Sequence, residues 1–357
     1  MTAGQAPEAY ARVRDKLKTN PKTWVVTGAA GFIGSNLVGE LLSLDQKVIG
    51  LDNFSTGYQK NLDDVARLGA PEQFFFIQGD IRRPEVCEAA CSGVDYVLHQ
   101  AALGSVPRSV GDPLTSNDVN VTGFLTVLSA AKAANVARFV YASSSSVYGD
   151  ATEIPQRESR VGRLLSPYAA TKATNEVYAS VFQRTYGVET VGLRYFNVFG
   201  PRQDPNGAYA AVIPRWVQHL LTRDPCVVFG DGETSRDFCY IANVVQANLL
   251  AATADSAATD EVYNVACGQQ TSLIQLFRLL RDGLAEYDSA IAGATLTHGQ
   301  PRVGDIRHSL ADIGKARRRL GYQPTHDVAS GLQEALAWYR ANVEQSSEAV
   351  APGETRT

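Results

Sequence analysis

The chain has 357 residues and a formal net charge of −4 at pH 7, and 20% of its residues are charged. This length allows a large buried core and predicts two lobes, while the charge balance offers no basic surface for nucleic acid or an anionic membrane. No apolar run is long enough to span a bilayer, and Met1 does not begin a signal-peptide pattern. The five cysteines lack C-x-x-C spacing and the five histidines lack ligand spacing, so we expect a cytoplasmic protein without disulfides or a metal site.

Residues 1–22 are predicted to form a helical extension before the first strand. The stretch 25–34, VVTGAAGFIG, then combines a β-branched run, a turn with three glycines and the start of an apolar-periodic helix. This order is typical of a parallel α/β sheet that presents a helix N-terminus to a pyrophosphate. Gly28 would form the tight turn, Gly31 would let the backbone approach the phosphates, and Gly34 would let helix and strand pack closely.

A second strand, 48–51, ends in Asp52. A carboxylate there can accept both hydroxyls of an adenosine ribose and disfavours a 2′-phosphate, so NAD is predicted rather than NADP. The polar loop that follows, and the end of a third, buried strand over 74–77, offer further groups to the adenosine side of a dinucleotide. The residues at these two places are Asn53, Ser55, Thr56, Gly57, Asp80 and Ile81.

A fourth strand, 96–99, ends in Gln100-Ala101-Ala102, where small residues permit close approach of a cofactor. A helix that begins near Pro113 carries Asn120 in its middle, and a fifth strand, 138–142, leads into four consecutive serines. Strands alternate with helices throughout, so we predict a doubly wound, Rossmann-type α/β fold with a parallel sheet.

The segment 166–172 predicts the start of another long helix, because Ser166 is a good N-cap and Pro167 suits the first helical position. Tyr168 and Lys172 are four residues apart and therefore share one face of that helix. An ammonium near a phenol favours the phenolate, and lowering the pKa from ~10 toward 7 requires about 4 kcal/mol of differential stabilisation. A Tyr-x-x-x-Lys pair is common, but here it follows a strand that ends in serines within a dinucleotide-binding lobe, which indicates catalysis.

The two lobes are predicted to interleave along the chain. The NAD-binding lobe would span 23–198, with 237–268 returning to it. A smaller α/β lobe for the substrate would comprise 199–236 and 269–341. Residues 342–357 lose apolar periodicity and are predicted to form a disordered tail.

From Thr23 to about Tyr339 the chain resembles the extended short-chain dehydrogenase/reductase family of nucleotide-sugar enzymes. The motifs that carry the resemblance are TGAAGFIGSNL, LDNFSTG, GDI, HQAA, SSSSVYGD, SPYAATK, LRYFNVFGPRQDP, GDGETSRDFCYI and PRVGDIRHS. Within this family the chain is most similar to bacterial 4-epimerases that act on UDP-N-acetylglucosamine and UDP-N-acetylgalactosamine and supply O-antigen and lipopolysaccharide biosynthesis. The N-terminal extension and the stretch HQAALGSVPRS indicate that branch.

The resemblance implies NAD as the cofactor and adds Tyr195, beside the nicotinamide, to its contacts. The residues implied to hold NAD are Gly28, Gly31, Phe32, Ile33, Gly34, Asp52, Asn53, Ser55, Thr56, Gly57, Asp80, Ile81, Gln100, Ala101, Ala102, Asn120, Tyr168, Lys172 and Tyr195. Tyr168 would be the base, and Lys172 would hold the nicotinamide ribose and lower the pKa of the tyrosine. Ser144, or Ser145 beside it, would hydrogen-bond the sugar O4. Loss of hydride from C4 would give a 4-keto sugar that turns over before hydride returns.

For a UDP-N-acetylhexosamine substrate, the resemblance implies contacts from the second lobe and its border. These are Asn197 and Arg302 at the diphosphate, Ala211, Val212 and Ile213 at the uracil, Arg236 at the uridine or phosphate, and Asp305 at the uridine ribose. Residues 226–229 are predicted to form a short strand, ending in Phe229, on which the uracil could pack. Ser309, four residues after Asp305, would face the C2 substituent of the sugar, where a small side chain leaves room for an acetamido group.

Family members pair the helices predicted over 113–134 and 167–186 into a four-helix bundle, so a homodimer is expected. Apolar residues on more than one face of these helices favour it: Val121, Leu125, Leu128, Val177, Val181 and Phe182. Other functions stay open, and one of them is a decarboxylase, which would need a carboxylate-bearing substrate. A UDP-glucuronate or UDP-N-acetylhexosaminuronate 4-epimerase would use the same residues. A 4,6-dehydratase would need an Asp-Glu pair where this chain has serines, and a non-catalytic NAD-binding sensor would not need an activated phenol.

Overall fold

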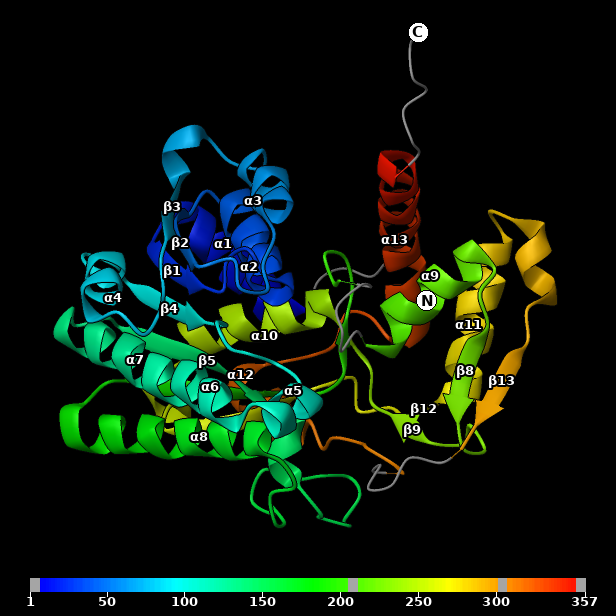
Figure 1. The fold of residues 1–357 in the computed structure, drawn as a ribbon. Coiled ribbons are helices and arrows are strands. Elements are labelled where there is room, and N and C mark those ends of the chain that lie inside the picture. Colours follow the sequence, from blue (N-terminus) through cyan, green and yellow to red (C-terminus); the bar gives the residue numbers. More distant parts are fainter. Residues whose placement is uncertain (1–6, 205–210, 301–306, 351–357) are drawn as a thin grey trace, which may run out of the picture.

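The computed structural model describes residues 7–204, 211–300 and 307–350. Within these ranges seven parallel strands form a central sheet in the order β11-β6-β5-β4-β1-β2-β3 (Figure 1). Their bounds are β1 Thr23–Thr27, β2 Lys47–Asp52, β3 Phe74–Gln78, β4 Tyr96–His99, β5 Arg138–Ser144, β6 Thr190–Tyr195 and β11 Glu261–Val265. The predicted doubly wound sheet is confirmed, and its strand order reverses between β1 and β4, where ligands bind in open α/β sheets.

Helices cover both faces of the sheet, because successive side chains of a strand point to opposite sides. In β1, Trp24 and Val26 join a core with α1, α2 and α10, whereas Val25 joins a second core with α4, α7 and α8. The helices around the sheet are α1 Glu8–Thr19, α2 Phe32–Ser43, α3 Gln59–Ala66, η1 Pro71–Gln73, α4 Pro84–Cys91, α5 Val106–Gly111, α6 Pro113–Asn117, η2 Asp118–Thr122, α7 Gly123–Ala133, η3 Ser145–Tyr148, α8 Pro167–Tyr186 and α10 Ile241–Thr253. The N-terminal extension is therefore a helix, α1, that packs on α10.

Two elements around the sheet differ in detail from the sequence prediction. The strand predicted over 74–77 is present as β3, but the prediction that it is buried is wrong. It is the last strand of the sheet, and Phe75 is 57% exposed. The helix predicted from Pro113 is one run of α6, η2 and α7, and η2 is a π-helical turn that contains the buried Asn120. A π-turn often marks a functional site in a helix.

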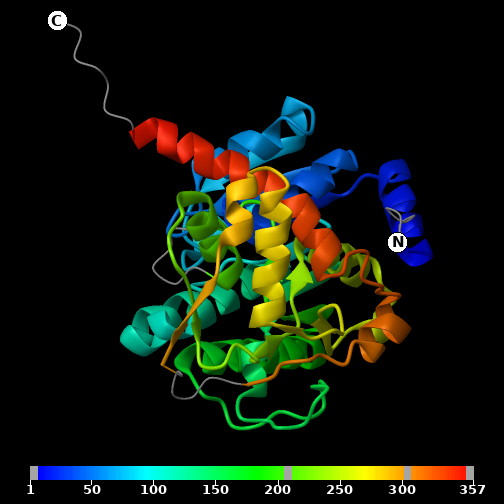
Figure 2. The same cartoon turned by 90° about the vertical axis from the view of Figure 1, so that its right-hand side faces the viewer.

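The smaller lobe lies beside the carboxyl ends of the strands and is built on helices and two-stranded pairs (Figures 1 and 2). Its elements and those at its border are β7 Val198–Phe199, α9 Val212–Thr222, β8 Cys226–Phe229, β9 Ser235–Arg236, β10 Cys239–Tyr240, η4 Ser256–Ala258, β12 Thr271–Ser272, α11 Leu273–Ala285, η5 Ser289–Gly293, β13 Leu296–Gly299, α12 Gly314–Leu320 and α13 Val328–Val350. Trp216 of α9 packs edge-on against Phe277 of α11. No helix in the described part of the chain is long and apolar enough to cross a membrane.

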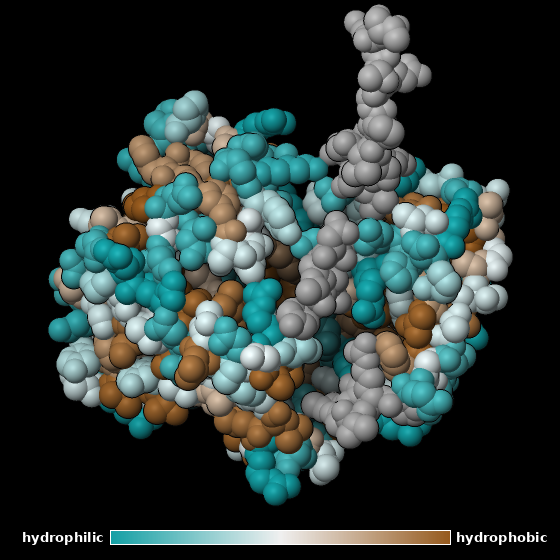
Figure 3. All heavy atoms as spheres, in the orientation of Figure 1, coloured by the Kyte–Doolittle hydropathy of each residue, from teal (hydrophilic) through white to brown (hydrophobic). Residues whose placement is uncertain are grey.

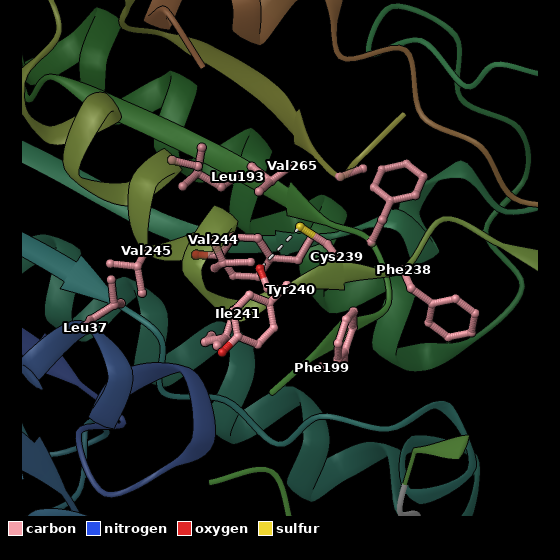
Figure 4. Packing of buried hydrophobic residues seen from close by; sticks show 14 of the residues in the cluster. Leu37, Leu193, Phe199, Phe238, Cys239, Tyr240, Ile241, Val244, Val245 and Val265 are labelled. Atoms are coloured by element: carbon pink, nitrogen blue, oxygen red, sulfur yellow. Dashed lines mark hydrogen bonds between the residues drawn. The ribbon is translucent and has the colours of Figure 1, made fainter. Parts of the chain in front are cut away.

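Segments of the two lobes pack against one another around β10 and α10. Figure 4 shows residues of β10 and α10, including Cys239 and Val244, packed with Leu193 of β6 and Val265 of β11. Asp237, just before β10, accepts hydrogen bonds from the backbone N–H groups of three residues that follow β11 or precede α12: Cys267, Gly268 and Ala311, at 2.9, 3.0 and 3.2 Å. Helix α12 also packs on β11, so the return to the first lobe extends beyond the predicted limit at 268.

The chain end also differs from the predicted disordered tail over 342–357. Helix α13 continues to Val350, and residues 351–357 lie outside the described ranges. The segment after Asn342 contains good helix formers such as Glu344, Gln345 and Ala349. Extending an existing helix needs no new nucleus, so such residues prolong a helix that tertiary packing has already fixed.

Candidate active site

The glycine turn after β1 has the geometry of a phosphate-binding loop. Gly28 has a φ of +70°, and a Cβ there would lie 2.9 Å from the Ala101 nitrogen. A Cβ on Gly34 would lie 2.0 Å from the Gly28 carbonyl oxygen, so helix and strand could not pack as they do. Gly31 is the N-cap of α2, which none of the described side chains caps. The first N–H groups of α2 and its dipole are therefore directed at a ligand position.

A cavity of about 290 Å³ opens at this turn, at the carboxyl ends of β1, β2 and β4. The predicted cofactor residues that line it are Gly28, Gly31, Phe32, Ile33, Gly34, Asp52, Asn53, Ser55, Thr56, Asp80, Ile81, Gln100, Ala101 and Ala102. Leu51, Gly79, Gly104 and Val119 line it as well and were missed. The first three flank predicted motifs, so widening each motif by a residue or two would have found them.

Asp52 is fixed by the backbone around the cavity. Its Oδ2 accepts the Ala30 N–H at 2.9 Å and its Oδ1 accepts the Phe54 N–H at 2.8 Å. Burial raises the pKa of this carboxyl, and the backbone hydrogen bonds oppose that shift. A carboxylate has about four lone-pair sites, so two remain for ribose hydroxyls. A buried carboxylate would repel a 2′-phosphate, and the residues present therefore fit NAD.

Gly57 and Asn120, which were predicted to contact the cofactor, do not line the cavity but support its walls. A Cβ on Gly57 would lie 2.7 Å from the Ala30 Cβ, so this glycine lets the loop that follows β2 pack on the glycine turn after β1. The Asn120 amide accepts the Leu103 N–H at 2.7 Å and donates to the Leu103 carbonyl and to Thr171. It thereby ties the segment after β4 to α8.

Ser144, Tyr168 and Lys172 meet at the carboxyl end of β5. The Tyr168 hydroxyl hydrogen-bonds Ser144, whose Oγ also accepts the Ser146 N–H at 3.1 Å. Lys172 is 2% exposed, and its Nζ donates to the Ala142 carbonyl at 2.8 Å and lies 5.9 Å from the centroid of the Tyr168 ring. Of the two candidate serines, Ser144 is therefore the one that the fold places against the tyrosine.

The electrostatics of this group differ from the expectation that Lys172 lowers the pKa of Tyr168. Burial raises the pKa of Tyr168, and the hydrogen bond with Ser144 opposes that shift. Burial also lowers the pKa of Lys172 to about 8, which Glu176 partly offsets. The ammonium is bonded to a backbone carbonyl and faces the ring rather than the hydroxyl, so burial has the larger effect on the phenol.

The backbone of Tyr168 is held by a residue that the sequence analysis missed. Ser109 of α5 is fully buried, and its Oγ accepts the Tyr168 N–H at 3.0 Å. Tyr195, the register neighbour of Ser144 on β6, donates its hydroxyl to Gln100 Oε1 at 3.0 Å. The hydroxyl oxygen of Tyr195 also accepts a hydrogen bond from the side-chain amide of Asn248 on α10 at 2.9 Å. Ser109 ends the quoted stretch HQAALGSVPRS and Asn248 belongs to no quoted motif, but in both cases only the fold reveals the contact.

The predicted substrate residues are only partly brought together. Ser309 donates its backbone N–H to the Ser235 carbonyl at 3.1 Å, which sets it beside β9 and Arg236. Asn197 donates its amide to the Asp237 carbonyl at 3.2 Å.

The residues of α9 and β8 that were predicted to contact the uracil differ in their exposure. Ala211 is the exposed N-cap of α9 and Val212 is half-buried, but Ile213 is 1% exposed and packs in the core. Phe229 pairs with Gly299 of β13. Arg302 and Asp305 lie outside the described residues. Among the residues that the structure describes, no group of three or more His, Cys, Asp or Glu side chains could hold a metal ion.

A doubly wound sheet with a glycine turn, a strand-end acid and a Ser-Tyr-Lys group defines a dinucleotide-dependent enzyme of the short-chain dehydrogenase/reductase type. The sequence profile of the NAD dependent epimerase/dehydratase family matches residues 24–266, so the chain belongs to this family, and its cofactor is NAD.

Three similar proteins illustrate the match. A putative UDP-glucose 4-epimerase of Methanocaldococcus jannaschii is 35% identical over 320 residues, which cover 89% of this chain and 98% of that protein. A solved UDP-N-acetylglucosamine 4-epimerase of Methanobrevibacter ruminantium, in complex with UDP-N-acetylmuramic acid, is 39% identical with a TM-score of 0.83. The match covers 90% of this chain and 99% of that chain. The solved UDP-glucose 4-epimerase of Thermus thermophilus, in complex with NAD, is 32% identical with a TM-score of 0.77. The match covers 89% of this chain and 99% of that chain.

Proposed function

We propose that this protein is a 4-epimerase that interconverts UDP-N-acetylglucosamine and UDP-N-acetylgalactosamine through a transient 4-keto sugar. The observation that carries the proposal is the meeting of Ser144, Tyr168 and Lys172 at the carboxyl end of β5, in the sheet that holds the dinucleotide cavity. The serines after β5 stand where a 4,6-dehydratase would need an acid-base pair. The likeness to a solved UDP-N-acetylglucosamine 4-epimerase supports the substrate class.

Each member of the catalytic group has a distinct task in this proposal. When bound, NAD supplies a hydride acceptor and donor at C4 of the sugar. Tyr168 takes the O4 proton in one direction and returns it in the other, and Ser144 aligns O4 through its hydroxyl. Lys172 keeps most of its charge at pH 7, because burial lowers its pKa only to about 8, and it would hold the nicotinamide ribose.

The walls of the site hold the groups that do not react. The N–H groups at the start of α2 and the carboxylate of Asp52 would fix the pyrophosphate and the adenosine ribose. Asn197, Arg236 and the segment from Ala211 would hold the UDP group while the sugar turns over. Ser309 would face the C2 substituent, since its neighbours on β9 border the proposed diphosphate position.

The proposal is tested with a panel of UDP-sugars and full product identification. The protein, supplied with NAD, is incubated separately with UDP-N-acetylglucosamine, UDP-glucose and UDP-glucuronate in deuterated water, and products are followed by NMR. We expect the 4-epimer of UDP-N-acetylglucosamine as the favoured product, with hydrogen retained at C4 because it returns as the transferred hydride. A 4-keto-6-deoxy product would instead identify a dehydratase, and preferred turnover of UDP-glucuronate would move the substrate to the uronic class.

We further propose that the enzyme is a homodimer through the surface of α6 and α8. Leu114 is 82% exposed and Val177 is 63% exposed, with Val181 also exposed (Figure 3 shows hydrophobic residues over this face). Leu128 and Phe182 were expected to contribute but are buried within the subunit. Light scattering should give a dimer mass for the wild type and a monomer for the V177E/V181E double variant, and a monomeric wild type would contradict the proposal.

A further inference from the structure

A second cavity, of about 550 Å³, lies between the N-terminal helix α1, helix α2 and the start of α10, apart from the residues that line the dinucleotide cavity. It is lined by Arg202, by Tyr10 of the extension and by Tyr240 and Ile241 at the start of α10. Figure 4 shows Tyr240, Ile241 and Val245 on the side of α10 that meets Leu37 of α2. The mechanism above uses none of these residues.

Arg202 makes no ion pair within 4 Å among the described residues, although the charge of Asp64 acts on it. Its Nε donates to Ser35 Oγ at 3.0 Å and its Nη2 donates to Asn36 Oδ1 at 2.7 Å, and both acceptors are neutral. Burial lowers the pKa of this guanidinium, which Asp64 partly offsets. A guanidinium has five N–H donors, so these two bonds leave donors for another acceptor.

The other charges at this cavity are already compensated. Arg14 pairs with Glu40 at 3.0 Å, and Glu40 also accepts the Tyr10 hydroxyl. His326 is bonded to Glu334, whose carboxylate also reaches Tyr240. Arg202 therefore supplies the positive charge that remains for a ligand. Gly39 also lines the cavity, and a Cβ there would be in ordinary van der Waals contact with Arg202 Nη2, at 3.9 Å.

We propose that this cavity is a binding site for a small oxyanion, a metabolite with a phosphate or carboxylate group, and that Arg202 is its charged contact. Guanidinium groups match both kinds of oxyanion in geometry. The rings and aliphatic groups of Tyr240, Ile241 and Val245 favour a ligand with an apolar portion next to its charge. The inference is independent of the sugar on which the enzyme acts, and it gives the N-terminal extension a role as one wall of the site.

The site is connected to the cofactor cavity by a short chain of hydrogen bonds. Ser35 and Asn36, the two acceptors of Arg202, each donate to the Phe32 carbonyl, at 3.1 and 2.9 Å. Phe32 is the first residue of α2 and lines the dinucleotide cavity. Asn36 also donates to the Pro201 carbonyl at 3.0 Å. An oxyanion on Arg202 would thus act on the helix that carries the phosphate turn.

Calorimetric titration of the holoenzyme tests the proposal. The protein is loaded with NAD and saturated with UDP, so that the proposed active-site anion positions are filled, and is then titrated with inorganic pyrophosphate or with malonate. We expect one of these probes to bind to the wild type, at least ~10-fold more weakly to R202M, and unchanged to R12M, which removes an exposed arginine of α1 outside the cavity. The probe that binds more tightly identifies the phosphate or the carboxylate class.

A second variant guards against misfolding of R202M. A242F places a ring in the cavity from α10 and leaves Arg202 and its two hydrogen bonds unchanged. The proposal requires that the affinity of A242F for the probe is also at least ~10-fold lower than that of the wild type. Its NAD content and UDP affinity should equal those of the wild type. Absence of binding by the wild type, or equal binding by the wild type and A242F, overturns it.

Discussion

The cofactor half of this site and the substrate half are built in different ways. The dinucleotide cavity is formed by backbone turns at the ends of regular strands, and 14 of the 19 residues predicted to hold the cofactor line it. The proposed substrate half would depend on side chains from two-residue strands and connecting segments, and Arg302 and Asp305 fall outside the described ranges. Ile213, predicted at the uracil, faces the core instead.

The difference follows from what each ligand needs. A pyrophosphate is bound by backbone N–H groups and a helix dipole, and residues of almost any type supply these. The sequence therefore needs to specify only the positions where a Cβ would clash, and glycines at a fixed spacing mark these positions. A sugar is selected by side chains that converge from distant segments, and such convergence leaves no local pattern. The predictions below test this contrast from the largest effect to the smallest.

Tyr168→Phe tests the chemistry where the two halves meet. Only a hydroxyl is lost, so the backbone bond to Ser109 and the packing of the ring remain. Loss of a general base typically reduces the rate by 10²–10⁴-fold, so we expect kcat for epimerisation to fall by that range while NAD and UDP binding persist. The measurement is turnover of UDP-N-acetylglucosamine with calorimetric binding of UDP. Tyr178→Phe, on the same helix, is the control, and substantial turnover by Tyr168→Phe would remove this residue from its assigned role.

Gly28→Ala tests whether backbone conformation defines the cofactor half. The positive φ of Gly28 and the 2.9 Å approach of a Cβ to Ala101 make alanine strained there. Gly104 lines the same cavity, but a Cβ on it would meet no atom within 4 Å, so Gly104→Ala is a matched control. Left-handed backbone costs about 1–2 kcal/mol for a residue with a Cβ, so NAD affinity should fall ~10-fold or more for Gly28→Ala only. Equal affinity of the two variants in a fluorescence titration would contradict the contrast.

The limits of sequence prediction follow the same physical distinction. Asp52, Gln100 and the Tyr168-Lys172 pair were found because each stands at a strand end or on one helix face. Ser109 and Asp237 stand in the quoted stretches HQAALGSVPRS and GDGETSRDFCYI, but their positioning roles were not recognised, because a buried hydrogen bond between segments far apart in the chain has no sequence signature. Such residues position the site without touching its predicted ligands.

Misassigned elements have equally specific causes. The run Phe74–Ile77 is apolar enough for a central strand, and only the strand order reveals that it forms an edge. The last helix outruns its apolar pattern because packing of its earlier turns against α11 and α9 fixes it, and the later residues then extend it.

Ser309→Tyr tests the substrate half. A phenol in place of a small, buried side chain should close the position proposed for the acetamido group. Overpacking costs about 1–3 kcal/mol, which is enough to shift the ratio of kcat/KM between UDP-N-acetylglucosamine and UDP-glucose by ~10-fold toward UDP-glucose. Ser309→Ala should leave the ratio within about twofold. Equal loss on both substrates would indicate general damage, and an unchanged ratio for Ser309→Tyr would exclude this residue as the gate.

The smallest expected effect concerns the charge of Lys172 in the cofactor-free protein. Burial lowers its pKa to about 8, below the value of about 10.4 in an unfolded chain. Below pH 8 the lysine is protonated in both states, and burying its charge destabilises the fold. Between pH 8 and 10.4 the unfolded chain binds the proton and the folded protein does not, so the contribution of this group to stability rises with pH.

Comparison with Lys172→Met isolates that contribution, because other titrating groups affect both proteins alike. The lysine also donates to the Ala142 carbonyl whether charged or neutral, so loss of that bond gives an offset that does not depend on pH. We expect the melting temperature of the wild type, relative to Lys172→Met, to rise by a few degrees between pH 7 and 9.5, which corresponds to roughly 1–2 kcal/mol. Lys47→Met, which removes an exposed lysine, is the control. A difference that stays constant or shrinks over this range would show that Lys172 is solvated, and the cofactor half would then be less tightly closed around its ammonium than the fold implies.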